Sequence, residues 1–135
     1  MTELQPIYAL LYGSNLAPNA SAGDIASLAR VSRTHNSEHH ITGILLFDGW
    51  RFIQYLEGPQ SSVLKLIQRI AADTRHVGFL IRHQGPDSSP RRFPSWSLGY
   101  AMAKDGYTFD TFDKAWGDET ITHLMRILPQ CELEP

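Results

Sequence analysis

Gln54 and Tyr12 are the side chains in this sequence best suited to do chemistry together. Gln54 lies in the run from Phe52 to Leu56, which otherwise reads as a buried strand, and it shares a face with both ends of that run because side chains alternate along a strand. Burying an amide without partners costs on the order of 1–3 kcal/mol, so a polar neighbour is predicted. Turning an amide over exchanges its donor and acceptor ends. Tyr12, in an apolar run, carries a phenol that is a hydrogen-bond donor and is oxidisable.

A predicted helix over residues 21–36 has a buried stripe that begins apolar and ends polar. From residues 25–29 the stripe continues at helical spacing onto Ser32, His35 and Asn36. Fraying, with Asn36 as a C-terminal cap, is one explanation. The other is that these groups converge with the tyrosine and the glutamine in one gap between helix and sheet, as a planar polar ligand requires.

Further polar residues have simpler explanations when each is taken alone. Arg69 and Asp73, four positions apart on a second predicted helix, read as a surface ion pair. His76, at the entrance to the next strand, reads as a loop residue. The pair Arg91-Arg92 reads as part of a solvated loop rather than as a phosphate site.

Several classes of function are disfavoured by composition and motifs. The formal charge of −2 and the pI near 6.3 give no general attraction to nucleic acid or to a membrane surface. His35, His39 and His40 do not form a complete metal-ligand set with a carboxylate or cysteine, and no nucleophile elbow or phosphate-binding glycine motif occurs. Cys131 is the only cysteine, in a predicted tail, and there is no secretory signal or apolar run of membrane length. We therefore expect a cytoplasmic protein, and none of these motifs supports an enzyme.

The predicted elements that must position these residues follow the order β-α-β-β-α-β-β. This α+β pattern predicts a ferredoxin-like fold with a mixed five-stranded sheet, two helices on one face and a short C-terminal helix. Its first and third strands would be neighbours, which places Tyr12 about 5 Å from Gln54. Residues 84–94 are predicted to form a long loop. We expect a main domain over residues 1–105 and a helical extension over residues 106–135.

A series of motifs spread over residues 7–103 resembles the BLUF family of blue-light sensors using a flavin. Each motif is weak alone, but their order and spacing together are specific. The motifs are Ile7-Tyr8-Ala9-Leu10-Leu11-Tyr12-Gly13-Ser14, Ser32-x-x-His35-Asn36, Ile41-Thr42-Gly43-Ile44-Leu45, Phe52-Ile53-Gln54-Tyr55-Leu56-Glu57-Gly58, Arg69-x-x-x-Asp73-x-Arg75-His76 and Arg92-Phe93-x-x-Trp96.

The resemblance implies a flavin held between the two helices, FAD in typical members, with FMN and riboflavin left open. Tyr12 and Gln54 match the photoactive tyrosine and glutamine of the family, and Asn36 matches the asparagine that binds the polar edge of the flavin ring. The other implied flavin-binding residues are Ser32, His35, Arg69, Asp73 and His76. No metal is implied.

The family mechanism assigns the light reaction to the first two of these residues. On excitation of the flavin, Tyr12 supplies an electron and a proton through Gln54, which is left rotated or tautomerised and donates a new hydrogen bond to a flavin carbonyl. Trp96 and Leu98 would then relay the change. The family commonly has methionine at the second of these positions, and leucine lacks the sulfur acceptor.

The resemblance predicts a blue-light photoreceptor that signals through contacts with an effector protein whose identity the sequence does not give, and we expect a homo-oligomer. One alternative is a flavin-binding interaction module without a light response. Another is a small hydrolase of the acylphosphatase kind, which is disfavoured because the segment after the first strand, residues 13–16, carries no anion-binding arginine.

Overall fold

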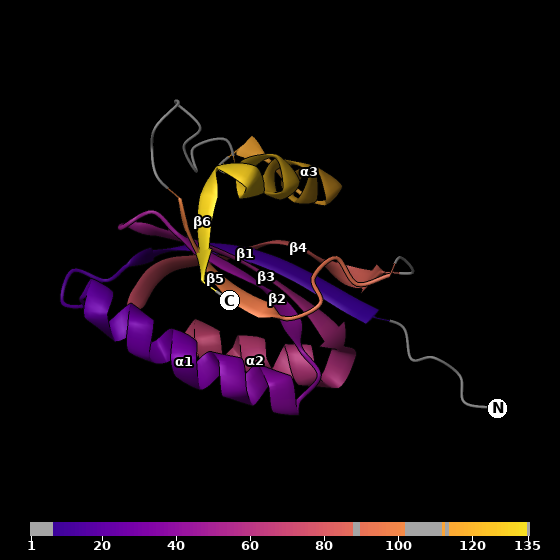
Figure 1. Ribbon diagram of the computed structural model, residues 1–135, viewed down its shortest axis with the longest axis horizontal. Coiled ribbons are helices and arrows are strands. Elements are labelled where there is room, and N and C mark those ends of the chain that lie inside the picture. The colour runs from indigo at the N-terminus through magenta and orange to yellow at the C-terminus, as the bar shows by residue number, and fades with distance from the viewer. Residues whose placement is uncertain (1–6, 88–89, 102–111, 113, 135) are drawn as a thin grey trace.

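The computed structural model describes residues 7–87, 90–101, 112 and 114–134 (Figure 1). Its elements, in chain order, are β1 (Ile7–Leu16), α1 (Ala22–Glu38), β2 (Thr42–Phe47), β3 (Arg51–Pro59), α2 (Gln60–Ala72), β4 (His76–Asp87), β5 (Trp96–Ala101), α3 (Asp118–Ile127), the 3-10 turn η2 (Leu128–Gln130) and β6 (Cys131–Glu134).

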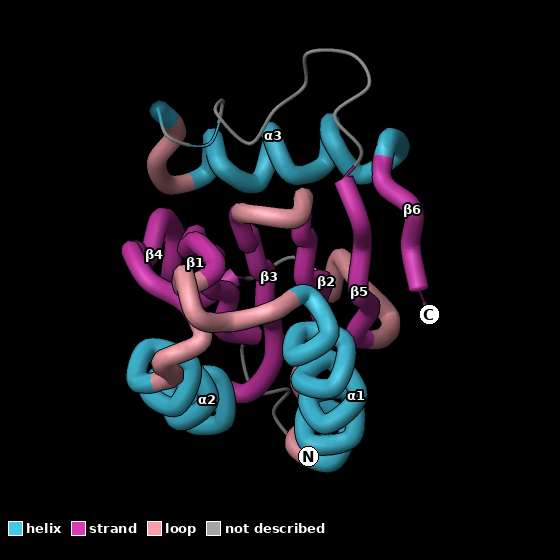
Figure 2. Tube along the Cα trace, turned by 90° about the vertical axis from the view of Figure 1, so that its left-hand side faces the viewer, coloured by secondary structure: helices cyan, strands magenta, loops and turns pink. Residues whose placement is uncertain are grey.

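The protein has three layers around a single mixed sheet, with strand order β4-β1-β3-β2-β5-β6. β2 and β5 are parallel, and the other neighbouring strands are antiparallel. α1 and α2 cover one face of the sheet, and α3 covers the other (Figures 1 and 2). The ferredoxin-like α+β fold is therefore confirmed. None of the described helices is both long and apolar enough to cross a membrane.

Two details of the predicted sheet are wrong. The sheet has six strands rather than five, because the segment predicted as a tail, Cys131–Glu134, pairs with β5. Four residues with two glutamates give no strand signal, and only the free edge of β5 orders them. In addition, β4 extends to Asp87, so residues 84–87 of the predicted loop are a strand. Pro86 is tolerated there because β4 is an edge strand.

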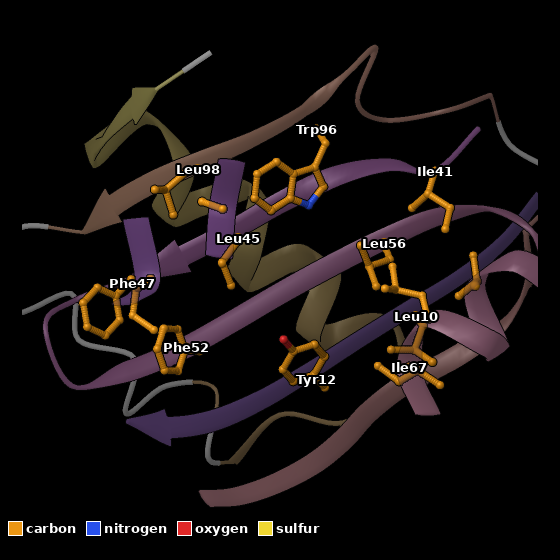
Figure 3. Close-up of a cluster of buried hydrophobic side chains, with 14 of the residues drawn as sticks. Leu10, Tyr12, Ile41, Leu45, Phe47, Phe52, Leu56, Ile67, Trp96 and Leu98 are labelled. Carbon is orange, nitrogen blue, oxygen red and sulfur yellow. The ribbon is translucent and has the colours of Figure 1, made fainter. Parts of the chain in front are cut away.

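One row of side chains runs across four strands on the face covered by α1 and α2. In the strand register Tyr12 pairs with Gln54, Gln54 with Leu45, and Leu45 with Leu98. Directly paired residues of adjacent strands share a face, and Tyr12, Leu45 and Leu98 of this row belong to the core beneath the two helices (Figure 3). The predicted adjacency of the tyrosine and the glutamine is confirmed.

The predicted division at residue 105 falls in residues 102–111, outside the described residues, and stays a prediction. The described part of the extension does form a core with the sheet. Ile121, Leu124 and Ile127 of α3 are buried against the face of the sheet opposite α1 and α2, in a cluster that includes Tyr55.

Candidate functional site

A cavity of about 260 Å³ lies between α1, α2 and the sheet. It is close to the lower end, about 300 Å³, of the usual range for small-molecule sites. All eight residues predicted to bind the cofactor line it, together with apolar side chains of both helices and the sheet. The lining residues are Tyr12, Ser14, Ile25, Leu28, Val31, Ser32, His35, Asn36, Leu45, Phe52, Gln54, Leu66, Arg69, Ile70, Asp73, Arg75 and His76.

The sheet wall of the cavity carries a buried hydrogen bond between the two central residues. The Tyr12 hydroxyl donates to Gln54 Oε1 at 2.6 Å, and both side chains are about 5% exposed or less. Burial, reinforced by the negative charge of Asp73, raises the pKa of the Tyr12 phenol. The phenol therefore stays protonated at neutral pH and remains a donor. Because the carbonyl end of Gln54 faces Tyr12, its NH₂ end is the one left for another partner.

The helix wall of the cavity presents a buried amide donor. α1 starts in a capping box formed by Ser21 and Asp24 and continues past Asn36 to Glu38, so Asn36 is not the C-terminal cap. Its side chain is only 1% exposed. The main-chain carbonyl oxygen of Asn36 accepts a hydrogen bond from Ile41 N at 2.8 Å, which fixes the end of the helix against the sheet.

Contacts around His35 decide which way this amide points. Arg69 Nη1 lies 3.3 Å from His35 Nε2, and because a guanidinium can only donate, Nε2 is the acceptor. The ring proton is therefore on Nδ1, which donates to Asn36 Oδ1 at 3.3 Å. Asn36 Nδ2, buried and without a partner, is left as a donor.

Ser14 is a second buried polar group without a partner at the cavity, and the sequence reasoning did not assign it. Its position two residues after Tyr12, on the same face of β1, was the signal that could have found it. Buried polar atoms are almost always hydrogen-bonded, so the orphan atoms of Ser14 and Asn36 call for a ligand. A flavin ring system fits them, because it combines flat apolar rings with an edge of carbonyl and N–H groups.

The α2 wall differs from the expected pairing. Asp73 binds Arg75, with Nε donating to Oδ1 at 2.9 Å, whereas Arg69 is turned towards His35. The expected ion pair between Arg69 and Asp73 is therefore wrong: Arg75 follows the end of the helix and reaches the carboxylate from the adjacent turn. The side-chain hydrogen bond from Arg75 lowers the pKa of Asp73 to about 2. His76 is held by Ile70, whose carbonyl oxygen meets its Nε2.

The two predicted relay residues lie outside the cavity wall. Trp96 and Leu98 are 4% and 1% exposed and belong to the core beneath α1 and α2 (Figure 3). Leu45 separates Leu98 from Gln54 in the row of paired residues. The indole Nε1 of Trp96 is buried and has no hydrogen-bond partner.

Among the described residues, no group of histidine, cysteine and carboxylate side chains is arranged to hold a metal ion. The side chains that line the cavity offer hydrogen bonds and apolar surface. This combination suits a planar organic ligand.

Comparison with curated proteins finds light-regulated relatives. The chain is 35% identical over 101 residues to photoactivated adenylate cyclase subunit beta of Euglena gracilis, and the aligned region covers 74% of this chain and 12% of that protein. It is 34% identical over 71 residues to the blue light- and temperature-regulated antirepressor BluF of Escherichia coli K12, covering 53% of this chain and 18% of that one. The chain thus spans a small part of the length of these relatives.

Solved structures share the fold over most of the chain. BlrB, a BLUF protein in its dark state, aligns with a TM-score of 0.75 and 32% identity over 93% of this chain and 97% of its own. BlrP1 of Klebsiella pneumoniae, solved with FMN and cyclic diGMP, aligns with a TM-score of 0.65 and 27% identity over 90% of this chain and 30% of its own. The match covers only 12% of the cyclase and 30% of the BlrP1 chain, so each of these proteins extends well beyond the matched region.

The sequence model of the BLUF family, described as sensors of blue light using FAD, matches residues 7–99. Together with the relatives and the fold, this match shows that the chain belongs to the BLUF family of flavin-based blue-light photoreceptors.

Proposed function

We propose that this chain binds FAD in the cavity between α1 and α2 and reports blue light by reorienting Gln54. The observation that carries the proposal is the buried 2.6 Å hydrogen bond from Tyr12 to Gln54 in the wall of a cavity that also holds the orphan donor of Asn36. A glutamine held by one phenol at its carbonyl end is a two-state element, since rotation exchanges the groups it presents to the ligand.

Each polar residue has a distinct role in this proposal. Asn36 and Ser14 offer hydrogen bonds to the polar edge of the ring, and His35 and Arg69 hold the Asn36 amide in its donating orientation. Ser32, Asp73 and His76 line the remaining polar wall. When bound and excited by blue light, a flavin supplies a strong oxidant at this position. Tyr12 would give up an electron to that oxidant and its phenol proton to Gln54 Oε1, the oxygen that already accepts the hydrogen bond, while the NH₂ end of Gln54 would pass one of its protons to the bound ligand, so that the amide keeps no net charge.

The flavin is proposed to be FAD on the basis of the family description. FMN and riboflavin remain the competing ligands, because the cavity contacts described above address only the ring and BlrP1 was solved with FMN. Releasing the flavin from purified protein and separating it by chromatography decides between the three.

The test of the whole proposal is an absorption spectrum before and after blue light. Purified protein should carry flavin, shift its absorption to longer wavelength on illumination and recover in the dark. The Gln54→Leu variant should bind flavin and lose the shift. A protein that takes up no flavin would refute the proposal, and a flavin-loaded protein with no shift would favour the alternative of a light-insensitive interaction module.

The light signal is proposed to pass to a partner protein or to a second copy of the chain. In this proposal residues 1–105 form the sensor and residues 106–135 form the extension that makes the contact. The proposed location is the cytoplasm. Trp116, Met125 and Leu133 support contact on this side, because their side chains are 46–55% exposed. The single cysteine suits a reducing compartment. Light scattering after size-exclusion chromatography, in the dark and under blue light, tests whether the chain forms a homo-oligomer and whether light changes it.

A further inference from the structure

Glu57 is a buried carboxylate that takes no part in the site described above. It lies near the end of β3, three residues after Gln54, and only 1% of it is exposed. Its side chain is on the same face of the sheet as Tyr55, which belongs to the core under α3 on the side opposite the cavity. A buried carboxylate is destabilising unless donors satisfy its oxygens, so its partners show what it holds.

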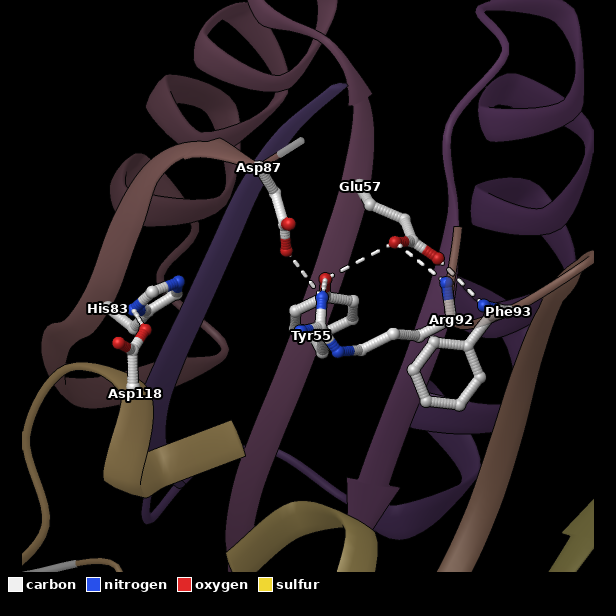
Figure 4. A network of polar contacts seen from close by, with 7 residues as sticks. All are labelled: Tyr55, Glu57, His83, Asp87, Arg92, Phe93 and Asp118. Carbon is white, nitrogen blue, oxygen red and sulfur yellow. Dashed lines mark hydrogen bonds and ion pairs between the residues drawn. The ribbon is translucent and has the colours of Figure 1, made fainter. Parts of the chain in front are cut away.

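Three donors satisfy this carboxylate (Figure 4). Oε1 accepts from the Tyr55 hydroxyl at 3.2 Å and from Arg92 N at 3.1 Å, and Oε2 accepts from Phe93 N at 2.7 Å. Two of the three are backbone N–H groups of the segment that joins β4 to β5. Glu57 therefore binds the main chain of that segment.

The side chains of Arg91 and Arg92 strengthen the same attachment. Arg91 donates to Thr42 Oγ1 at 2.9 Å, to the carbonyl oxygen of Glu57 at 3.1 Å and to the carbonyl oxygen of His40 at 2.8 Å. It thus joins the end of α1 to β2 and β3. Arg92 bonds to Asp87 and to the Tyr55 hydroxyl. The expectation that this arginine pair is a solvated loop is wrong, because both guanidinium groups are held by protein acceptors.

The attached segment leads directly into β5. Phe93 precedes Trp96, the first residue of that strand, by three positions, and Ser95 O accepts from Gly43 N at 3.3 Å. Two residues after Trp96, Leu98 pairs with Leu45, which in turn pairs with Gln54. The bonds to Glu57 thus fix the segment that enters β5, in addition to the pairing of β5 with β2.

We propose that Glu57 is a positioning residue for the light response: by binding the backbone of residues 92 and 93 it holds β5, with Trp96 and Leu98, in fixed contact with the row of Gln54. This inference rests on the proposed function for its light-dependent part. The carboxylate acts from the opposite face of the sheet and does not touch the cavity lining.

The test compares Glu57→Gln with wild type, both as full-length, flavin-loaded protein. Glutamine has a similar size but replaces one acceptor oxygen with an NH₂ group that faces a backbone donor. Hydrogen exchange in the dark should become roughly tenfold faster or more for the amides of Arg92 and Phe93, since each loses or weakens a bond to a charged acceptor. The dark recovery of the light-shifted spectrum should also change by several-fold, with flavin occupancy unchanged.

Two controls separate positioning from loss of stability. Asp87→Asn removes the ion pair of Arg92 but leaves the backbone bonds of Glu57 intact, so exchange at Phe93 should stay at the wild-type rate. Ile127→Val lowers the stability of the α3 core, against which Phe93 packs, but removes none of the hydrogen bonds that hold the segment, and it should leave recovery unchanged. If Glu57→Gln does not fold, Arg91→Gln tests the same attachment and should show the same two changes.

The outcomes divide cleanly. Unchanged exchange at residues 92 and 93 would overturn the proposed contact, and faster exchange with wild-type recovery would overturn the positioning role. Recovery altered equally by Ile127→Val would assign the effect to general stability and also overturn it. A wild-type protein with no light response would refute the proposed function, whereas the exchange measurement would still decide whether Glu57 holds β5.

Discussion

Replacing Tyr12 with phenylalanine isolates the hydroxyl that the proposed light reaction requires. The ring is retained, so its contacts are kept, including the tilted packing on Phe79 with 4.9 Å between the ring centroids. Only the donor to Gln54 Oε1 is lost. Gln54 is 4% exposed, so in the flavin-free protein that oxygen becomes a buried acceptor without a donor.

The magnitude follows from this geometry. An unsatisfied buried acceptor costs about 1–3 kcal/mol, out of about 5–15 kcal/mol for a typical domain, so the variant should remain folded. Because the Tyr12–Gln54 bond is short and fully buried, we expect about 2 kcal/mol of lost unfolding free energy. Flavin binding should persist and the light-induced shift should be abolished.

The chain offers a matched control in the same strand. The Tyr8 hydroxyl donates to Gln84 Oε1 at 3.1 Å, which is also a phenol–glutamine bond, but it is only partly buried and lies outside the cavity. Tyr8→Phe should cost about 0.5–1.5 kcal/mol and leave the light response intact. In a Gln54→Leu background, Tyr12→Phe should cost less than it does alone, because the two residues share the bond.

The assays are urea unfolding, followed by circular dichroism, and absorption spectra before and after blue light. A Tyr12→Phe protein with an undiminished spectral shift would show that the phenol is not the electron and proton donor. A loss of stability no larger than that of Tyr8→Phe would show that the buried Tyr12–Gln54 bond contributes less than about 2 kcal/mol to the free energy of unfolding.

Three further predictions concern single side chains. Asn36→Ala removes the orphan donor, so it should weaken flavin binding roughly tenfold in a fluorescence titration; Ser37→Ala, at an exposed position of the same helix, should leave flavin binding unchanged. The pKa of Asp73 is lowered to about 2 in the folded state from 3.8, so the stability it contributes is present above about pH 4 and is lost as pH falls towards 2. Asp73→Asn should therefore reduce the dependence of the melting temperature on pH between 4 and 2, modestly because Arg75 is 41% exposed. An unchanged pH dependence would contradict the assignment. Burial raises the pKa of the Cys131 thiol, so it should react with a thiol reagent more slowly than glutathione at pH 8, and a rate equal to that of glutathione would contradict its half-buried position in β6.

Local sequence patterns predicted the elements with strong periodicity and the residues that share a face of each element. The polar stripe of α1 and the misplaced amide of Gln54 were visible because alternation and helical spacing assign a face to each residue. The helix predicted from residue 21 does begin there, with Ser21 as the N-cap of α1 in a capping box. Strand order then followed from topology, which brought Tyr12 beside Gln54.

Features that depend on contacts between residues far apart in the chain could not be predicted from local patterns. β6 exists because β5 offers an open edge, and the orientation of Asn36 depends on Arg69, which comes from the other helix. The choice of Arg75 over Arg69 as the partner of Asp73 depends on how the chain turns after α2. The sequence did not distinguish Glu57 from other strand residues, because no local pattern shows that its carboxylate is buried and accepts hydrogen bonds from the backbone N–H groups of residues 92 and 93. Local patterns fix which face a side chain takes, whereas hydrogen-bond partners far apart in the chain are chosen only when the layers pack.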